Sequence, residues 1–323
     1  MARCTIGIDL GGTNIKAGIV DRAGVLLGRT SIPTEARQGF EHVFGRLVGL
    51  IETLPGELGV QRRDIAAVGI GTPGPMSHKE GIIYGAPNLP GWVNIPLRDR
   101  LSTAIGLPVT LDNDANAAAF GEFTAGAGRD VSDMVMLTLG TGIGGGIVVA
   151  GRLLRGFFDN AAEIGHTIMV PDGRPCPCGQ RGCFERYASA NAVAERLVEA
   201  IGAGERSSLG PRVQAGGRIT SRDVCTAAQA GDELARRIWD ETCRYLAIGC
   251  VNVQHMVNPE LIVLGGGLIG AGAALLEPVR HHFGQLVWNV SRDAPHIEFA
   301  TLGDDAGVIG AAALAALDHG GQS

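Results

Sequence analysis

The sequence predicts an α/β protein built from two domains. Segments rich in β-branched residues alternate with segments of helical periodicity along a chain of 323 residues. A strand–turn–strand pattern at 9–20 returns at 138–148, so the chain contains an internal repeat of two domain starts. A chain of this length can bury one large core or two moderate ones, and the repeat favours two.

Composition excludes several classes of protein. Hydrophobic residues make up 45% and charged residues 19%, an ordinary globular balance. The net charge of −6 argues against nucleic acid as a partner, because such a binder needs a basic face. The sequence shows neither a signal-peptide pattern nor an apolar span of about 18 residues. We therefore expect a soluble cytoplasmic protein without a membrane partner or a disulfide framework.

The chain opens with three predicted strands at 5–10, 15–21 and 25–29, which form an antiparallel meander. The first turn, Gly11-Gly12-Thr13-Asn14, offers backbone N–H groups and a hydroxyl, which suit a phosphate. Most such turns only connect strands, but Gly140-Thr141-Gly142 repeats this one. Two equivalent turns facing across a cleft would hold one polyphosphate. The sequence contains no P-loop motif.

The remaining elements follow from periodicity and turn residues. The predicted helices lie at 40–54, 96–105, 190–201, 221–230, 232–257, 273–283 and 307–317, and the strands at 65–70, 109–112, 261–264 and 296–301. Two Pro-rich loops, 71–75 and 86–92, resemble loops that line clefts. Gly265-Gly266-Gly267 follows a predicted strand and precedes a predicted helix. These glycines would admit a nucleotide close to the backbone, or they simply form a sharp turn.

A polar cluster follows the strand at 109–112. Asp112, Asn113, Asp114 and Asn116 stand where this strand meets an Ala-rich helix. Asn113 or Asp114 can serve as an N-cap. Four polar residues in five positions exceed what a cap requires, so the cluster is also a candidate site.

The segment 163–185 combines the residue types of a metal site. His166, Cys176, Cys178 and Cys183 provide three thiols and one imidazole, the ligand set of a closed structural zinc site. Prolines and glycines between them break helix and strand, which leaves the backbone free to wrap a metal. The spacing differs from that of a two-Cys, two-His finger, so we interpret the segment as a zinc loop within a larger domain. The alternative is a set of reduced thiols without a metal.

Together these segments resemble the ROK family of repressors, open reading frames and sugar kinases, and within it the bacterial ROK-type glucokinases. The motifs that carry the resemblance are Asp9-Leu-Gly-Gly-Thr13, Glu163-x-Gly-His166 and Cys176-x-Cys178-Gly-x-x-Gly-Cys183-x-Glu185. The resemblance implies an actin-like or hexokinase-like (ribonuclease H-like) fold with an interdomain cleft. Its implied domains are a small one at 1–112, with the helix at about 306–323, and a large one at 113–305 that contains the zinc loop.

The resemblance also implies roles for individual residues. The general base is Asp114. The sugar-binding residues are Asn113, Asp114, Glu163, His166 and Glu185. The ATP-binding residues are Asp9, Gly11, Gly12, Thr13, Thr141, Gly142, Gly265, Gly266 and Gly267. The zinc ligands are His166, Cys176, Cys178 and Cys183. Mg²⁺ would accompany ATP, and the chain would act as a homodimer or a tetramer.

The implied activity is ATP-dependent phosphorylation of the 6-hydroxyl of glucose. N-acetylglucosamine kinase, N-acetylmannosamine kinase and fructokinase stay open as alternatives, as do phosphate donors other than ATP. A sugar-responsive repressor is disfavoured because the first strand begins at residue 5, which leaves no room for a helix-turn-helix module. A non-sugar ATPase is disfavoured by the zinc loop and its flanking glutamates.

Overall fold

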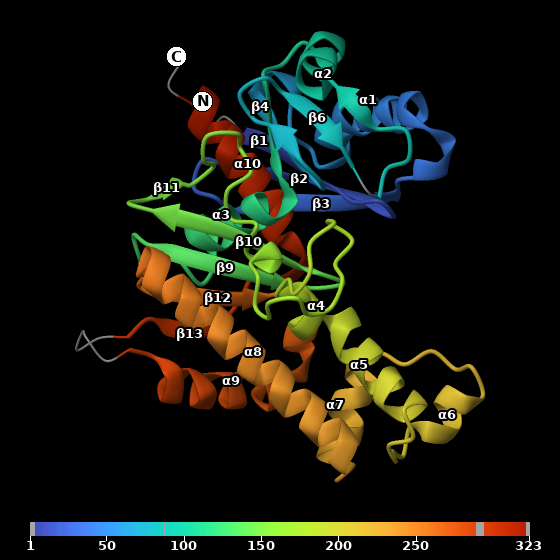
Figure 1. Cartoon of the computed structure of the whole chain (residues 1–323). Helices are drawn as coiled ribbons and strands as arrows, with labels where there is room; N and C mark the ends of the chain where they lie inside the picture. The colour runs from blue at the N-terminus through green and yellow to red at the C-terminus, as the bar shows by residue number, and fades with distance from the viewer. Residues whose placement is uncertain (1–3, 87, 289–293, 321–323) are drawn as a thin grey trace. The chain divides into compact units, whose positions relative to one another are not determined.

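The computed structural model describes residues 4–86, 88–288 and 294–320. The chain divides into two compact units (Figure 1). The first comprises 1–132, 146–162 and 301–323, and the second comprises 133–145 and 163–300. The predicted domain division at residue 112 stays a prediction, and residues 321–323 of its C-terminal helix lie outside the described residues.

The first sheet has the order β3-β2-β1-β4-β8. Its strands are β1 (Cys4–Leu10), β2 (Asn14–Val20), β3 (Leu26–Pro33), β4 (Ile65–Thr72) and β8 (Val109–Asn113). The first three form the predicted antiparallel meander, and β4 and β8 continue it in parallel. Parallel neighbours need crossover connections, and α1 (Phe40–Glu57) and α2 (Leu97–Ile105) provide them.

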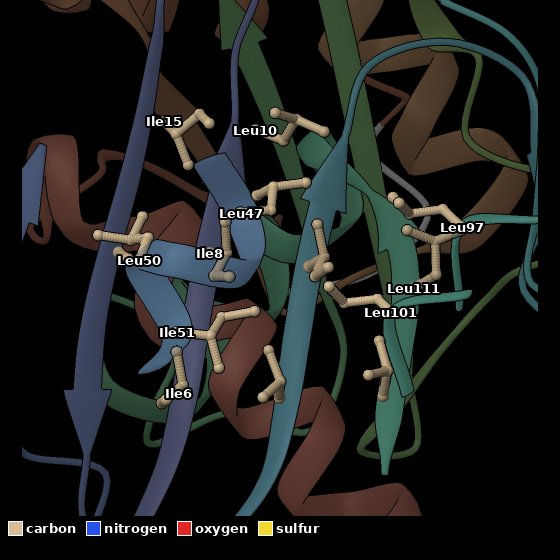
Figure 2. Packing of buried hydrophobic residues seen from close by; sticks show 14 of the residues in the cluster. Ile6, Ile8, Leu10, Ile15, Leu47, Leu50, Ile51, Leu97, Leu101 and Leu111 are labelled. Atoms are coloured by element: carbon tan, nitrogen blue, oxygen red, sulfur yellow. The ribbon is translucent and has the colours of Figure 1, made fainter. Parts of the chain in front are cut away.

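One face of this sheet is covered by α1 and α2. Figure 2 shows Leu47 and Ile51 of α1 against Ile6 and Ile8 of β1. All four side chains are fully buried. Each such side chain contributes roughly 1.5–3 kcal/mol by leaving water. This core holds the carboxyl ends of β1 and β8 in a rigid frame.

The other face is covered by α3 (Asp114–Ala125) and α10 (Ala306–His319), and Figure 1 shows α10 in red beside β1 and β4. A Cβ atom at Gly7 or at Gly69 would overlap the backbone of α10. Glycine is therefore required at these positions, because the backbone of the helix touches the strands.

A small sheet of order β5-β6-β7 completes the first unit, and the sequence did not predict it. Its strands are β5 (Met76–Ser77), β6 (Ile82–Gly85) and β7 (Val93–Ile95). Strands of this length show no hydrophobic periodicity that could reveal them. In the loop predicted at 86–92, residue 87 lies outside the described residues.

The second large sheet has the order β11-β10-β9-β12-β13. Its strands are β9 (Met134–Leu139), β10 (Ile143–Val149), β11 (Arg152–Leu153), β12 (Leu261–Gly265) and β13 (His296–Phe299). As in the first sheet, the three successive strands of a meander precede two later strands. This correspondence confirms the internal repeat predicted from the sequence.

The remaining α-helices belong to the second unit. They are α4 (Glu185–Ala188), α5 (Ala190–Gly202), α6 (Gly210–Gln214), α7 (Ser221–Gln229), α8 (Glu233–Val257) and α9 (Ala273–Leu286). The 3-10 helices of the chain are η1 (Ala36–Gln38), η2 (Arg62–Asp64), η3 (Ile164–His166), η4 (Gly267–Ala271) and η5 (Gly303–Asp305). The long helix α8 packs against α7 and α9. Among the described residues, no helix is long and apolar enough to span a bilayer.

Candidate functional site

The turn between β1 and β2 is held in one shape by its neighbours. The fully buried Thr34 donates its hydroxyl to Gly11 O at 2.6 Å and its backbone N–H to Thr13 O at 2.8 Å. A Cβ atom at Gly12 would lie 2.7 Å from the Cβ of Asn88, so a larger residue would displace the turn. The backbone groups of this predicted phosphate turn are therefore preorganised.

Asp9 is the second-last residue of β1, beside this turn. Burial raises the pKa of its carboxyl, and the cation of Lys16 opposes that rise. Lys16 lies opposite Asp9 in the β1–β2 register, and its Nζ contacts Asp304 Oδ1 at 3.2 Å. Asp9 was predicted from the sequence and Lys16 was not, although the hairpin register could have revealed it. Asp304 lies 288 positions from Lys16, so no local sequence pattern could have predicted their contact.

Asn113 and Asp114 occupy the junction between β8 and α3. Asn113 is the N-cap, and its Oδ1 accepts hydrogen bonds from Ala115 N at 2.9 Å and Asn116 N at 3.3 Å. Asp114 is the first residue of the helix and is exposed. The positive end of the helix dipole stabilises its carboxylate. The capping role foreseen for this pair is therefore real, and it leaves the Asp114 carboxylate accessible.

Asp112 differs from Asp114 in both burial and bonding. Its side chain is 4% exposed. Its Oδ1 accepts from Asn113 N and from Asn116 Nδ2, each at 2.9 Å. These bonds hold the Asp112 carboxylate within the protein. Asp114 is the exposed carboxylate of this cluster, and its Oδ1 accepts a hydrogen bond from Ala115 N at 2.8 Å.

In the second unit, the predicted zinc ligands lie together. One ligand atom from each of His166, Cys176, Cys178 and Cys183 lies within 4.8 Å of all the others. The Cys178 and Cys183 sulfurs are 3.6 Å apart, and Cys176 Sγ is 3.7 Å from His166 Nδ1. A tetrahedral zinc with bonds of about 2.0–2.3 Å separates its ligand atoms by roughly 3.5–3.8 Å. The residues therefore fit a structural zinc ion.

The backbone of the loop brings these ligands together. Ile168 forms a β-bridge with Cys183, and Pro175 forms one with Arg181. Gly182 has a φ of 79°, a conformation that favours glycine, and a Cβ there would overlap Val170 O. These contacts return the chain from His166 to the cysteines within one compact loop.

The two glutamates predicted to bind sugar lie at this cluster. Glu163 Oε2 is 3.9 Å from His166 Nε2, the imidazole nitrogen that does not face Cys176. Glu185 Oε1 accepts a hydrogen bond from Cys176 Sγ at 3.2 Å. Burial raises the pKa of the Cys176 thiol, so a metal ion must displace its proton in order to bind. A zinc ion would thus order both the imidazole and the loop that presents Glu185.

Two of the predicted nucleotide turns lie in the second unit, and one of them approaches this loop. A Cβ at Gly142 would lie within 2.5 Å of Glu185 Oε2. Gly265 pairs with Thr138 on β9, and a Cβ at Gly266, where φ is 84°, would meet Leu139 O at 2.7 Å. The second unit therefore contains two of the three predicted glycine turns and both glutamates that are predicted to bind sugar.

A family model described as "ROK family" matches residues 5–317. This chain belongs to the ROK family. It is 38% identical over 309 residues to a glucokinase of Halalkalibacterium halodurans, with 95% of this chain and 93% of that protein covered. It is 36% identical over 313 residues to an N-acetylmannosamine kinase of Citrobacter koseri, with coverages of 96% and 98%.

Solved ROK structures share the fold. The crystal structure of a ROK family glucokinase from Streptomyces griseus, in complex with glucose and AMPPNP, superposes with a TM-score of 0.77. The two chains are 35% identical, and the match covers 97% of this chain and 99% of that one. The predicted family and α/β fold class are both confirmed.

Proposed function

We propose that this ROK protein is a glucokinase that transfers the γ-phosphoryl group of ATP to the 6-hydroxyl of glucose. The observation that carries the proposal is the Asn113–Asp114 pair, in which an exposed carboxylate follows the carboxyl end of a parallel strand. Similarity to the Halalkalibacterium halodurans glucokinase supports the choice of activity and substrate. The Streptomyces griseus structure, with glucose and AMPPNP bound, supports the choice of donor.

In this proposal Asp114 is the general base. A primary hydroxyl has a pKa far above 7, so a carboxylate must accept its proton as the new oxygen–phosphorus bond forms. The bond between the γ-phosphorus and the β–γ bridging oxygen breaks, and its electron pair leaves with ADP. Positioning and charge neutralisation supply most of the rate enhancement for such a transfer.

The sugar hydroxyls need partners that both accept and donate. Glu163 and Glu185 accept hydrogens from hydroxyls, His166 donates through Nε2, and Asn113 does both. Hydrogen bonds to charged groups contribute roughly 1.5–3 kcal/mol each, enough to reject an epimer that loses one. A zinc ion held by His166 and the three cysteines would take no part in the chemistry and would fix the tautomer of His166.

The nucleotide is assigned to the glycine turns. Its phosphates meet the turns that contain Gly11, Gly12 and Thr13, and Thr141 and Gly142. Its adenosine lies near Gly265, Gly266 and Gly267. Mg²⁺ would neutralise charge on the phosphates, and Asp9 would hold one of its waters, since Mg²⁺ retains several. We also propose a homodimer, or a tetramer, in the cytoplasm, with the domain division at residue 112.

A substrate panel tests the proposal. The ratio kcat/KM should be measured for glucose, mannose, fructose, N-acetylglucosamine and N-acetylmannosamine, each with ATP and with polyphosphate. Glucose with ATP should give the highest value. If kcat/KM for N-acetylmannosamine exceeds that for glucose severalfold, the chain is an N-acetylmannosamine kinase, as the Citrobacter koseri relative is named. If no sugar stimulates release of ADP, the chain is not a sugar kinase.

Replacing Asp114 tests its role. Asp114→Asn should lower kcat by roughly 10²–10⁴-fold. Glucose affinity, measured by calorimetry, should change little, because an amide keeps the hydrogen-bonding shape. Asp99→Asn is the matched control, since Asp99 is an exposed carboxylate in the first turn of α2. A kcat of Asp114→Asn close to that of the control would remove Asp114 from the base role.

A further inference from the structure

Arg155 forms an ion pair with Asp112, the residue that directly precedes Asn113 and Asp114. Arg155 Nε donates to Asp112 Oδ2 at 2.7 Å. The Arg155 side chain is 20% exposed and that of Asp112 is 4% exposed. Both residues belong to the first unit. Short charge-assisted bonds of this kind are strong and directional.

The second oxygen of Asp112 extends this pair into the proposed catalytic residues. Asp112 Oδ1 accepts from Asn113 N and Asn116 Nδ2. Asn113 then caps the first turn of α3 through Ala115 N and Asn116 N. The orientation of one buried carboxylate thus sets the backbone of Asn113 and, through the cap, the helical turn that carries Asp114.

The segment that carries Arg155 is itself anchored. Ala161 N donates to Arg155 O at 2.9 Å. Four residues further on, Asp159 Oδ2 accepts from Ser77 Oγ at 3.0 Å and from Lys79 N at 3.2 Å. The guanidinium is therefore presented from a fixed loop and can act as a rigid support for Asp112.

Stability alone does not explain this arrangement. Burying an ion pair costs desolvation that its attraction often only offsets, so an apolar pair of similar volume would serve folding as well. His78 Nδ1 lies 3.7 Å from Asp112 Oδ2 but is also 2.9 Å from Leu111 O. Arg155 is thus the charged partner that approaches Asp112 most closely.

We propose that Arg155 is a positioning residue that orients Asn113 and Asp114 through Asp112. It touches neither sugar nor nucleotide, and its loss slows phosphoryl transfer by misplacing the base. The proposal rests on the function assigned above. A displacement of about 1 Å at a reacting group can cost roughly 100-fold in rate.

A double-mutant cycle tests this proposal. Arg155→Met should lower kcat by roughly 10–100-fold while the KM for ATP stays within about twofold. In the Asp114→Asn background the same substitution should change kcat by less than about threefold, because there is no base left to misplace. Arg155→Lys keeps the charge and should recover part of the loss.

Three outcomes would overturn the proposal. The first is that Arg155→Met reduces kcat by the same factor in the wild-type and Asp114→Asn backgrounds, which indicates loss of folded protein. The second is that Arg155→Met leaves kcat unchanged. The third is that kcat of Arg155→Lys is no higher than that of Arg155→Met although thermal melting shows both variants to be folded. Arg62→Met is the matched control, because Arg62 donates to Ile105 O at 2.6 Å in the same unit. It should lower the melting temperature without changing kcat.

A failure of the proposed kinase function would give other results than a failure of the Arg155 proposal alone. If Asp114→Asn retains wild-type kcat, or if wild-type protein phosphorylates no sugar, the assigned function fails and the role of Arg155 falls with it. If Asp114→Asn is inactive as expected and the cycle is additive, only the role of Arg155 fails.

Discussion

At the scale of the single residue, the ionised form of Asp9 that would hold a water of Mg²⁺ is the form that burial disfavours. Its carboxyl lies beneath the start of α10, where a Cβ at Gly307 would be 3.3 Å from Asp9 Cγ. Burial raises the pKa of Asp9 although Lys16 opposes the rise. A carboxyl whose pKa is higher in the folded state contributes stability below its unfolded pKa and loses it as pH rises through the folded value. Ionised Asp9 therefore costs stability at neutral pH.

Asp9→Asn should raise the free energy of unfolding at pH 7 and weaken catalysis. The ratio kcat/KM for MgATP should fall by roughly 10–100-fold, because a hydrogen bond to a charged group is worth about 1.5–3 kcal/mol. Urea denaturation at pH 7 and pH 4 measures the first effect, and the stability gained should shrink at the lower pH. A variant less stable than wild type at pH 7 would contradict this account.

Among the elements, α8 depends most clearly on its N-cap. Asp232 Oδ1 accepts from Ala235 N at 2.9 Å, and Oδ2 accepts from Ser207 Oγ at 2.8 Å and from Ser208 Oγ at 2.7 Å. Burial alone would raise the pKa of Asp232, but these hydrogen bonds outweigh it and lower the pKa to about 2. The stability from ionised Asp232 is present above the unfolded pKa and is lost as pH falls through about 2.

Asp232→Ala should lower the free energy of unfolding by about 1–2 kcal/mol at pH 7, as is typical for loss of a helix cap. The difference from wild type should narrow below about pH 4, because Asp232 of the unfolded wild-type chain then gains a proton while the folded cap stays ionised down to about pH 2. Urea denaturation at pH 7 and pH 3 measures both values. Glu233→Ala, at the exposed next position, should have little effect at either pH. An equal loss for Asp232→Ala at both pH values would show that ionisation is unimportant.

At the scale of the whole molecule, the metal links folding to the proposed sugar site. Glu163 opens the long second segment of the second unit, and the loop that follows contains isolated bridges in place of regular strands. A zinc ion would add four ligand bonds to a loop with little other regular structure. Because Glu163 and Glu185 flank the ligands, loss of zinc should affect stability and sugar binding together.

Removing zinc by exhaustive chelation should lower the melting temperature by several degrees and weaken glucose binding by roughly 10–100-fold. Cys178→Ser should do the same, although Cys178 is exposed and its substitution costs little packing. Cys225→Ala is the control, since this buried thiol lies outside the cluster and its variant should retain zinc. If the zinc-free protein keeps wild-type glucose affinity, the metal has no role in sugar binding.

The features predicted from sequence are those encoded locally. The helix predicted at 40–54 is α1 (Phe40–Glu57), and the strand predicted at 109–112 is β8 (Val109–Asn113). Periodicity and turn residues act over a few positions, so the pattern alone reveals such elements. The four residues of the Cys/His cluster could be predicted for the same reason, since they lie within one short segment of the chain.

The sequence by itself determined the two meanders, the glycine turns, the cap at Asn113 and the Cys/His cluster that could hold a metal. Only the tertiary structure decided which distant charges meet. Arg155 reaches Asp112 across 43 positions and Lys16 reaches Asp304 across 288. Such pairs depend on where crossovers and the last helix return to the sheet. No local pattern records that, because the energy of a long-range contact belongs to the folded chain as a whole.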